Sequence, residues 1–345
     1  MIIFSQTFFV ILQSVFFTMQ DYLSEIRRPI EAEMSRFNAL YDESMSHADD
    51  GMLNNALGYI RQRSGKRMRP MLTILMAKNF GMVSDKTYLT AVGLELLHTA
   101  SLVHDDVVDE ADCRRGQSSI NNVYGNKSAV LIGDYILSTA LLNVAKTGCT
   151  KIMECLSGLG RTLANGEIMQ LTANGSEDIS EEAYYSIIEQ KTAALFEACC
   201  EMGAMSVNAA AEDIEEAKKF GRILGTIFQI RDDIFDYYEL SQLGKPTGND
   251  MAEGKLTLPA IHILLTTDNA EMLTIAQRVK ALEATKGEIA KLIDFTKKNG
   301  GVEYAENVMY RLHDEARKFI DSRVGNESIK LSLTAYLDYS IKRTL

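Results

Sequence analysis

Only four prolines occur in the 345 residues of this chain, and they are widely spaced. Proline interrupts the hydrogen-bond ladder of a helix, so a chain with so few of them can sustain long helices. Apolar residues recur with helical spacing from about residue 20 to the C-terminus. One stretch, 129–145, is apolar on nearly every face, which is typical of a helix inside a large bundle. The sequence therefore predicts an all-α fold, a single large bundle of long helices.

No linker rich in proline, glycine or serine divides the chain, and no repeat of fixed period occurs. We therefore expect one helical domain over residues 19–345. Residues 1–18 carry no charged side chain, and they lack the positive start and the small-residue cleavage site of a signal peptide. We interpret them as an extension outside the fold, with Met19 as the true start. A weak membrane anchor is the alternative, since about 18 apolar residues is the lower edge for a membrane span.

The formal net charge is −11 at pH 7. An acidic chain lacks the basic footprint of a nucleic-acid-binding protein, so we expect no such partner. Phosphate ligands remain compatible with it, because a divalent cation can bridge carboxylates to phosphate. The five cysteines form no CxxC pair and no histidine pair has zinc-site spacing, which argues against a disulfide framework or a zinc site. This cysteine usage fits a reducing compartment, so we expect a cytoplasmic protein.

Two copies of the pattern DDxxD stand out, and each ends a long apolar helix. The aspartates are Asp105, Asp106 and Asp109 in the first motif and Asp232, Asp233 and Asp236 in the second. On a helix, the first and last aspartates of a motif share a face, one turn apart. Like charges at that spacing repel unless a cation lies between them, and Mg²⁺ suits carboxylates combined with substrate phosphates. One motif alone could be a solvated acidic face, but two argue against that interpretation.

Basic residues occur where a metal–phosphate site needs them. The candidates are Lys66, Arg69, Arg114, Arg115, Lys191, Lys245 and Lys255. Arginine and lysine both bind diphosphate, arginine with the stronger directionality. Taken singly, each is more commonly a surface charge than a ligand, although Lys191 lies within an apolar helix. His98 lies two turns before Asp105 on the same helix face, and a lone histidine there is more commonly part of the core.

The motifs, in this combination and order, resemble the family of trans-isoprenyl diphosphate synthases. The resemblance rests on SGKRMRP (64–70), LLHTASLVHDDVVDEADCRRG (96–116), QKTAALFEA (190–198), FQIRDDIFDYY (228–238) and LGKPTGNDMAEGKLTLP (243–259). It extends from about residue 20 to the C-terminus and is closest to bacterial octaprenyl- and heptaprenyl-type long-chain members. One departure is Ser64, which stands where the family usually has the first of two glycines.

The resemblance implies a helical bundle around a deep central cavity, usually a homodimer. It also implies condensation of an allylic diphosphate with isopentenyl diphosphate, head to tail and with trans double bonds. The allylic diphosphate is ionised with the help of Mg²⁺, three ions per site, and the double bond of isopentenyl diphosphate attacks the carbocation. Water must be excluded from such a site. Transient membrane contact would help to release a greasy product.

The site roles are likewise implied by the resemblance. The first aspartate motif is implied to hold Mg²⁺ on the allylic diphosphate from one side, and the second motif from the opposite side. The residues implied to contact the allylic diphosphate are Arg114, Lys191 and Lys245, with Thr192, Gln229 and Lys255 nearby. Those implied to bind isopentenyl diphosphate are Lys66, Arg69, His98 and Arg115.

Product length is expected to depend on Ala100 and Ser101, which lie about one turn below Asp105. In family members with short products, bulky aromatic residues at these two places stop chain growth. Both residues are small here, and the first motif lacks the two extra residues found in many bacterial short-chain members. We therefore expect a long product of octaprenyl type, for quinone side chains. The stop itself would come from neighbouring helices, for which Tyr135 and Met153 are candidates, as is Met169, although each is more commonly core filling.

Three alternatives remain open. The first is a synthase with a shorter product, geranylgeranyl or farnesyl diphosphate. The second is a terpene cyclase or a head-to-head, squalene-type synthase, neither of which needs the set of Lys66, Arg69 and His98. The third is a non-catalytic partner subunit of a heteromeric synthase. Such subunits typically lose acidic residues, and here all six aspartates are present.

Overall fold

The computed structural model describes residues 19–47, 51–62, 65–114, 116–173, 179–238 and 247–343. Four features of the sequence analysis therefore lie outside the described residues: the segment 1–18, Ser64, Arg115 and Lys245. The described chain is almost entirely helical, which confirms the predicted all-α fold. Its strands form one short antiparallel ribbon, β1 (Cys113–Arg114) with β2 (Gln117–Ser118).

The helices follow one another along the chain with short connections. In order they are α2 (Met19–Arg27), the 3-10 turn η1 (Arg28–Ile30), α3 (Glu31–Ser44), α4 (Met52–Arg61), α5 (Met68–Phe80), α6 (Asp85–Val108), α7 (Ile120–Tyr124), α8 (Asn126–Ala145), α9 (Thr150–Ala173), α10 (Glu181–Ile188), the π-helical turn η2 (Glu189–Ala193), α11 (Ala194–Ser206), α12 (Ala211–Phe235), α13 (Asn249–Ala252), α14 (Leu258–Thr266), α15 (Ala270–Lys280), α16 (Lys286–Lys298), α17 (Gly301–Arg323) and α18 (Glu327–Lys342).

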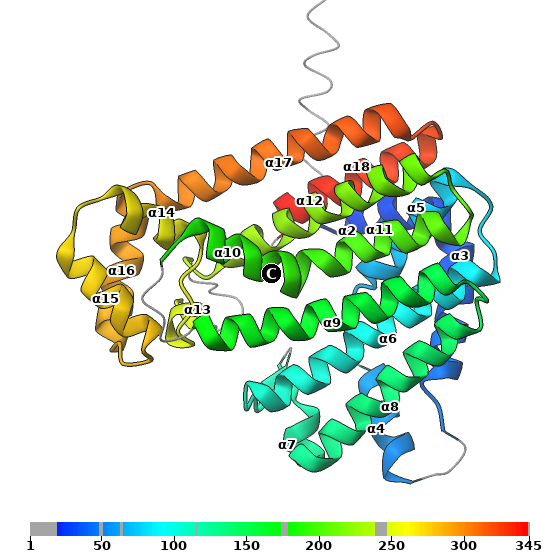
Figure 1. Cartoon of the computed structure of the whole chain (residues 1–345), viewed down its shortest axis with the longest axis horizontal. Coiled ribbons are helices and arrows are strands. Elements are labelled where there is room, and N and C mark those ends of the chain that lie inside the picture. Colours follow the sequence, from blue (N-terminus) through cyan, green and yellow to red (C-terminus); the bar gives the residue numbers. More distant parts are fainter. Residues whose placement is uncertain are drawn as a thin grey trace, which may run out of the picture.

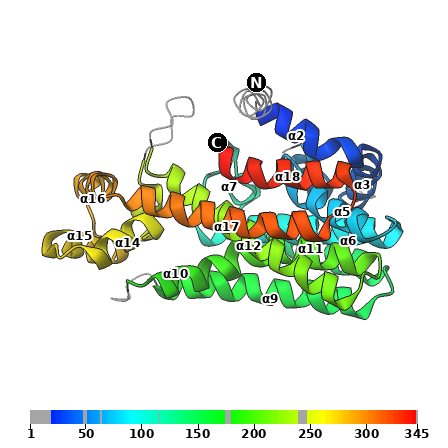
Figure 2. The same ribbon diagram turned by 90° about the horizontal axis from the view of Figure 1, so that it is seen from above.

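Long helices run side by side and make up most of the bundle. Helices α9, α11, α12 and α17 lie in parallel rows, with α6 and α8 alongside α9 (Figure 1). Helices α2 and α18, from opposite ends of the chain, pack against each other (Figure 2). The shorter helices α14, α15 and α16 gather at one end of the bundle (Figure 1). This arrangement surrounds α6 and α12, the two helices that carry the acidic motifs, with packed neighbours.

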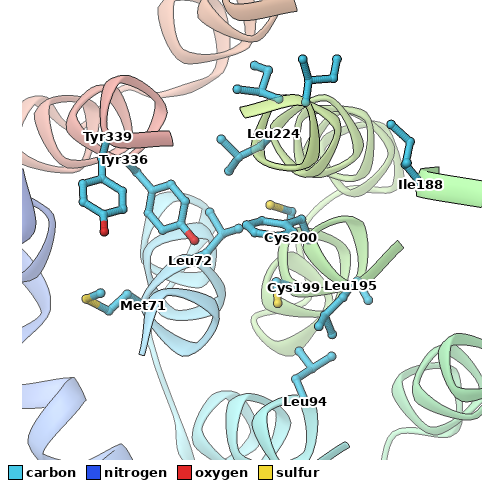
Figure 3. Close-up of a cluster of buried hydrophobic side chains, with 14 of the residues drawn as sticks. Met71, Leu72, Leu94, Ile188, Leu195, Cys199, Cys200, Leu224, Tyr336 and Tyr339 are labelled. Atoms are coloured by element: carbon cyan, nitrogen blue, oxygen red, sulfur yellow. The ribbon is translucent and has the colours of Figure 1, made fainter. Parts of the chain in front are cut away.

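The core joins the helices that position the site. Figure 3 shows Leu72 of α5, Leu94 of α6, Cys200 of α11, Leu224 of α12 and Tyr336 of α18 in one apolar cluster. All five side chains are at most 1% exposed. Burial of an apolar side chain of this size contributes about 1.5–3 kcal/mol each, so the cluster holds these helices in fixed relative positions.

Two glycines allow unusually close helix packing near the site. A methyl group on Gly225 of α12 would lie 2.5 Å from Ala193 Cα in η2, and one on Gly93 of α6 would lie 2.4 Å from Val144 Cγ2 in α8. Neither distance is compatible with a side chain. Glycine thus brings η2 directly against α12, and it brings α8 directly against α6.

Helix α8 differs from the sequence expectation. The stretch 129–145 was predicted to lie inside the bundle, but only one side of α8 packs against α6 and α9. Its other side exposes Val130, Leu131, Leu141 and Leu142, with Leu131 68% and Leu142 57% accessible. The prediction fails because no helix of this chain, within its described residues, covers that side. Among the described residues, α8 is also the only helix long and apolar enough to cross a membrane, by length and composition alone.

Candidate active site

The two acidic motifs lie at the C-terminal ends of α6 and α12, as the sequence predicts. Asp105 and Asp106 belong to the last turn of α6, and Asp109 caps it. Asp232 and Asp233 belong to the last turn of α12. The C-terminal end of a helix carries partial negative charge, which adds to the charge of the carboxylates. Both helix ends are therefore strongly electronegative.

The third aspartate of the second motif organises the loop that follows. Asp236 caps α12 and accepts backbone N–H groups of Asn249 at 2.9 Å and Asp250 at 3.1 Å. Burial raises the pKa of Asp236, and these backbone hydrogen bonds oppose that increase. The same bonds fix the start of α13, which carries Asp250 toward the site.

Asp105 is partly buried beside a second carboxylate on α9. Burial, and next the charge of Glu167, raise the pKa of Asp105 to about 6, while Lys191 and Arg114 oppose the increase. Lys191 Nζ lies 2.7 Å from Glu167 Oε2 and donates to Gln170 Oε1 at 3.0 Å. Lys191 thus lies beside Glu167 and Gln170 of α9, and its charge acts on Asp105.

The turn η2 places Lys191 and Thr192 against α12. A π-helical turn inside a longer helix frequently marks a functional site. Thr192 Oγ1 donates to Gln229 Oε1 at 2.7 Å, and Gln229 Nε2 donates to Asp233 Oδ1 at 2.7 Å. Tyr184 of α10 donates to the other oxygen, Asp233 Oδ2, at 2.6 Å. The predicted neighbours Thr192 and Gln229 therefore form a chain of hydrogen bonds that ends on the second acidic motif.

Asp250 adds a further acid to this side of the site. Burial, and next the charge of Asp236, raise the pKa of Asp250 to about 7. Burial also raises the pKa of Asp233, to which the charge of Asp250 adds. Lys255 lies among these acids: burial lowers its pKa, but Glu253, Asp250 and the more distant Asp109 outweigh that effect and raise it. Lys255 thus experiences Asp109 of the first acidic motif together with Asp250, which lies beside the second motif.

A pocket of about 190 Å³ connects these groups. Its polar lining includes Lys191, Thr192, Gln229, Asp233, Asp250 and Lys255. The pocket thus brings together Lys191, Thr192, Gln229, Asp233 and Lys255, all predicted to lie around the allylic diphosphate, whereas Arg114 and the first acidic motif do not line it. Within the described residues, no three acidic, histidine or cysteine side chains converge closely enough to hold a metal ion alone. An all-oxygen donor set with raised carboxylate pKa values fits a hard cation such as Mg²⁺, whose remaining ligands would be substrate oxygens.

A second, larger cavity of about 510 Å³ is lined by residues of α5, α6, α11, α12 and α18. Its basic lining residues are Lys66, Arg67, Arg69, His98, Arg114 and Arg343. The structure thus brings together Lys66, Arg69 and His98, as predicted for the isopentenyl diphosphate site. Arg114 lines this cavity as well, and its Nε donates to Asp106 Oδ1 at 2.6 Å.

Two further basic groups of this cavity also have partners. Arg67, in a left-handed backbone conformation with φ +56°, donates to Glu95 at 2.9 Å and lies 3.9 Å from the Tyr41 ring centroid. Lys66 donates to the Tyr339 hydroxyl at 2.8 Å. Because Glu95 and Asp106 are both paired with arginines, the cavity carries an excess of positive charge and suits an anion.

Ala100 and Ser101, whose small size is predicted to permit a long product, lie below Asp105 on α6. Ala100 is buried, at 1% exposed, while Ser101 is half-buried and donates to the His98 carbonyl oxygen at 2.9 Å. One turn further down, Leu97 Cδ1 lies 3.6 Å from the position that a methyl group on Gly160 of α9 would take. Small side chains at Ala100 and Ser101 therefore leave α6 narrow just below the acidic cluster.

Sequence reasoning missed Glu167, Gln170, Tyr184, Asp250 and Arg343. Glu167 and Gln170 are three residues apart on α9, which places them on one helix face, but no pattern linked that face to the aspartates. Asp250 lay within a motif that was recognised, without a role. Nothing in the sequence indicates that Tyr184 and Arg343 reach the second motif, because those contacts depend on tertiary packing.

Known proteins are similar to this chain in both sequence and fold. Residues 50–295 match the family model described as polyprenyl synthetase. Octaprenyl diphosphate synthase of Escherichia coli (strain K12) is 38% identical over 258 residues, which are 74% of this chain and 79% of that protein.

Two solved structures extend the comparison. A geranylgeranyl pyrophosphate synthase from Bacteroides thetaiotaomicron is 44% identical, with a TM-score of 0.82, and the match covers 94% of this chain and 100% of that one. A polyprenyl synthase from Caulobacter crescentus CB15, complexed with calcium and isoprenyl diphosphate, is 29% identical, with a TM-score of 0.85, over 93% of this chain and 98% of that one. This chain belongs to the polyprenyl synthetase family and is a prenyl diphosphate synthase, a transferase of prenyl groups.

The raised pKa of Asp105 predicts a stability effect in metal-free protein. A carboxylate whose native pKa of about 6 exceeds its ordinary 3.8 destabilises the native state above pH 3.8, fully so above about pH 6. Asp105→Asn should therefore raise the free energy of unfolding at about pH 7.5 by about 1–3 kcal/mol. The gain should shrink as the pH falls to about 4.5. Denaturant unfolding in EDTA at both pH values measures it, and a gain that does not depend on pH would contradict the assignment.

Proposed function

We propose that this enzyme makes a long-chain, all-trans polyprenyl diphosphate of octaprenyl type, which supplies quinone side chains. One observation carries the proposal: two acidic helix ends, with Lys191 beside the first and Lys255 between Asp109 and Asp250, are accompanied by a separate cationic cavity. The first arrangement suits a metal-bound allylic diphosphate, and the second suits the diphosphate of isopentenyl diphosphate. Two adjoining diphosphate sites are what a head-to-tail condensation requires.

The two sites divide the work between them. The first motif (Asp105, Asp106 and Asp109) and the second aspartate motif would hold Mg²⁺, three ions in our proposal, and bound Mg²⁺ would neutralise charge on the leaving diphosphate. Lys191 and Lys255 would bind its oxygens directly. On the family resemblance alone, since both residues lie outside the described part of the chain, Lys245 would join them and Arg115 would join the isopentenyl diphosphate site.

The remaining groups would orient the second substrate. Lys66, Arg69 and His98 would hold isopentenyl diphosphate with its double bond facing the allylic carbon. Arg114 lies between the two sites, since it pairs with Asp106 and lines the cationic cavity. The apolar helices around the reacting carbons would exclude water, which would otherwise capture the carbocation. The released diphosphate would accept the proton lost at the end.

Replacement of both Asp105 and Asp109 by alanine tests the metal role. Incorporation of labelled isopentenyl diphosphate into farnesyl diphosphate should fall by at least about a thousandfold, because the leaving group loses its charge stabilisation. EDTA should abolish incorporation by the parent. As a control, Glu216→Ala changes an exposed ion pair far from the site and should leave incorporation intact. Activity of the double variant within about tenfold of the parent would exclude the metal role. A well-folded parent with no incorporation would favour a cyclase or a partner subunit.

Product length is proposed from the small side chains below the first motif. Ala100 and Ser101 carry no bulky ring that would stop chain growth there, and the octaprenyl diphosphate synthase of Escherichia coli (strain K12) is among the relatives. The similar structure from Bacteroides thetaiotaomicron is that of a geranylgeranyl pyrophosphate synthase, so a product of that length is the alternative.

Ser101→Phe tests this account of product length. An aromatic ring one turn below Asp105 should block the growing chain, so the product sized after dephosphorylation should become shorter by several isoprene units. Ser101→Ala, which adds no bulk, is the matched control and should keep the parent product. An unchanged product from Ser101→Phe would show that the chain does not pass this point. A parent product of four units or fewer would favour the geranylgeranyl alternative.

A homodimer and a cytoplasmic location complete the proposal. The uncovered apolar side of α8, which includes Leu131 and Leu142, suits burial against a second copy of this chain. Sedimentation velocity should give a dimer, and a monomer at micromolar concentration would contradict this part.

Transient contact with a membrane would help to release the product, and its test is product release with and without lipid vesicles.

A further inference from the structure

The C-terminal arginine Arg343 connects the two sites. Its NH2 group donates to Asp232 Oδ1 at 2.7 Å, and the side chains are 10% and 34% exposed respectively. The same nitrogen donates to the carbonyl oxygen of Phe228 at 2.9 Å, and the guanidinium lies 3.6 Å from the Phe228 ring centroid. Phe228 and Asp232 are four residues apart on α12, so they lie on one helix face and contact the guanidinium together.

Arg343 also faces the cationic cavity. It lines that cavity together with Lys66, Arg69 and His98. A guanidinium carries five N–H donors, and Arg343 Nε is buried with no hydrogen-bond partner in the described part of the chain. Arg343 therefore has donor capacity beyond its contacts with Asp232 and Phe228, and it lies at the wall of a space that suits an anion.

Asp232 provides only some of the contacts that hold the Arg343 guanidinium in place. The Phe228 ring and carbonyl oxygen contact the guanidinium independently of the carboxylate, and stacking on an aromatic ring is a favourable arrangement for arginine. Arg114, the partner of Asp106, is more exposed, at 36%. If Asp232 acquires another cation, Arg343 can stay on Phe228 and turn donors toward the cavity.

We propose that Arg343 is an exchangeable counter-ion, which neutralises Asp232 in the metal-free enzyme and passes to the diphosphate of isopentenyl diphosphate when a divalent cation takes Asp232. The inference rests on the proposed function, because it takes Asp232 as a metal ligand and the cationic cavity as the isopentenyl diphosphate site. Binding of the metal-bound allylic diphosphate then strengthens the binding of isopentenyl diphosphate. By thermodynamic linkage, isopentenyl diphosphate strengthens the binding of the metal-bound allylic diphosphate by the same factor. The enzyme thereby favours binding of isopentenyl diphosphate when the allylic substrate is already present.

Calorimetric titration of isopentenyl diphosphate into the whole protein in EDTA tests the exchange without metal or turnover. Asp232→Asn removes the charge that holds Arg343, so this variant should bind isopentenyl diphosphate about tenfold more tightly than the parent, within the usual range of coupled sites. The same substitution in an Arg343→Ala background should give no gain. Thermal melting checks that each variant is folded.

The outcomes separate the exchange from simpler explanations. An Asp232→Asn affinity within about twofold of the parent overturns the proposal. An equal gain in the Arg343→Ala background also overturns it, because long-range charge alone would then explain the effect. A further outcome concerns the proposed function itself. If the folded parent binds isopentenyl diphosphate neither in EDTA nor when it is loaded with Mg²⁺ and the S-thiolo analogue of farnesyl diphosphate, the proposed function fails together with the exchange.

A second titration tests two affinities that the exchange requires to change in opposite directions when Arg343 is replaced. Arg343→Ala should bind Mn²⁺ with the S-thiolo analogue more tightly than the parent, since no arginine competes for Asp232, yet it should bind isopentenyl diphosphate more weakly in the loaded enzyme. An arginine with a purely structural role would weaken both, and that result would contradict the proposal. Lys342→Ala is the matched control, because Lys342 is 47% exposed and contacts Asp338 and Tyr22 instead; both affinities should be unchanged.

Discussion

Repulsion among carboxylates at two helix ends is the constraint on which the site depends. Asp105 meets Glu167, and Asp233 meets Asp250, in surroundings partly or wholly shielded from water. Burial makes each charge costly, and proximity adds to that cost. The lysines between the clusters reduce it only in part, which explains why the carboxylate pKa values stay raised. Such an arrangement suits divalent cations and anionic ligands that would share the site with them.

The helical bundle holds the two acidic helix ends in a fixed position relative to each other. Close approach at Gly225 sets η2 against α12, and the contacts from Thr192 through Gln229 to Asp233 turn that approach into a fixed orientation. The apolar cluster around Leu94 and Leu224 keeps α6 and α12 from moving apart. Rigid helices therefore carry the acidic groups, while Lys191 and Lys255 approach them from neighbouring segments.

Sequence alone predicted the helical class and the positions of both acidic motifs, because each depends on local spacing within one helix. It also predicted that Lys66, Arg69 and His98 meet in one place, but only through a family resemblance. It could not predict the contact between Arg343 and Asp232, which are 111 residues apart, nor the role of Glu167 beside Asp105. Those contacts arise from packing between helices. The exposed side of α8 was mispredicted for the same reason, since hydrophobicity indicates burial without saying what provides it.

The central claim is that both acidic motifs hold one diphosphate through shared metal ions. Crystals grown with Mn²⁺ and the S-thiolo analogue of farnesyl diphosphate would locate the ions directly by anomalous diffraction. We expect Mn²⁺ bonded to carboxylates of the first motif and of the second, with a single diphosphate bridging them and Arg343 moved away from Asp232. Ions at only one motif, or a diphosphate that contacts neither, would contradict it.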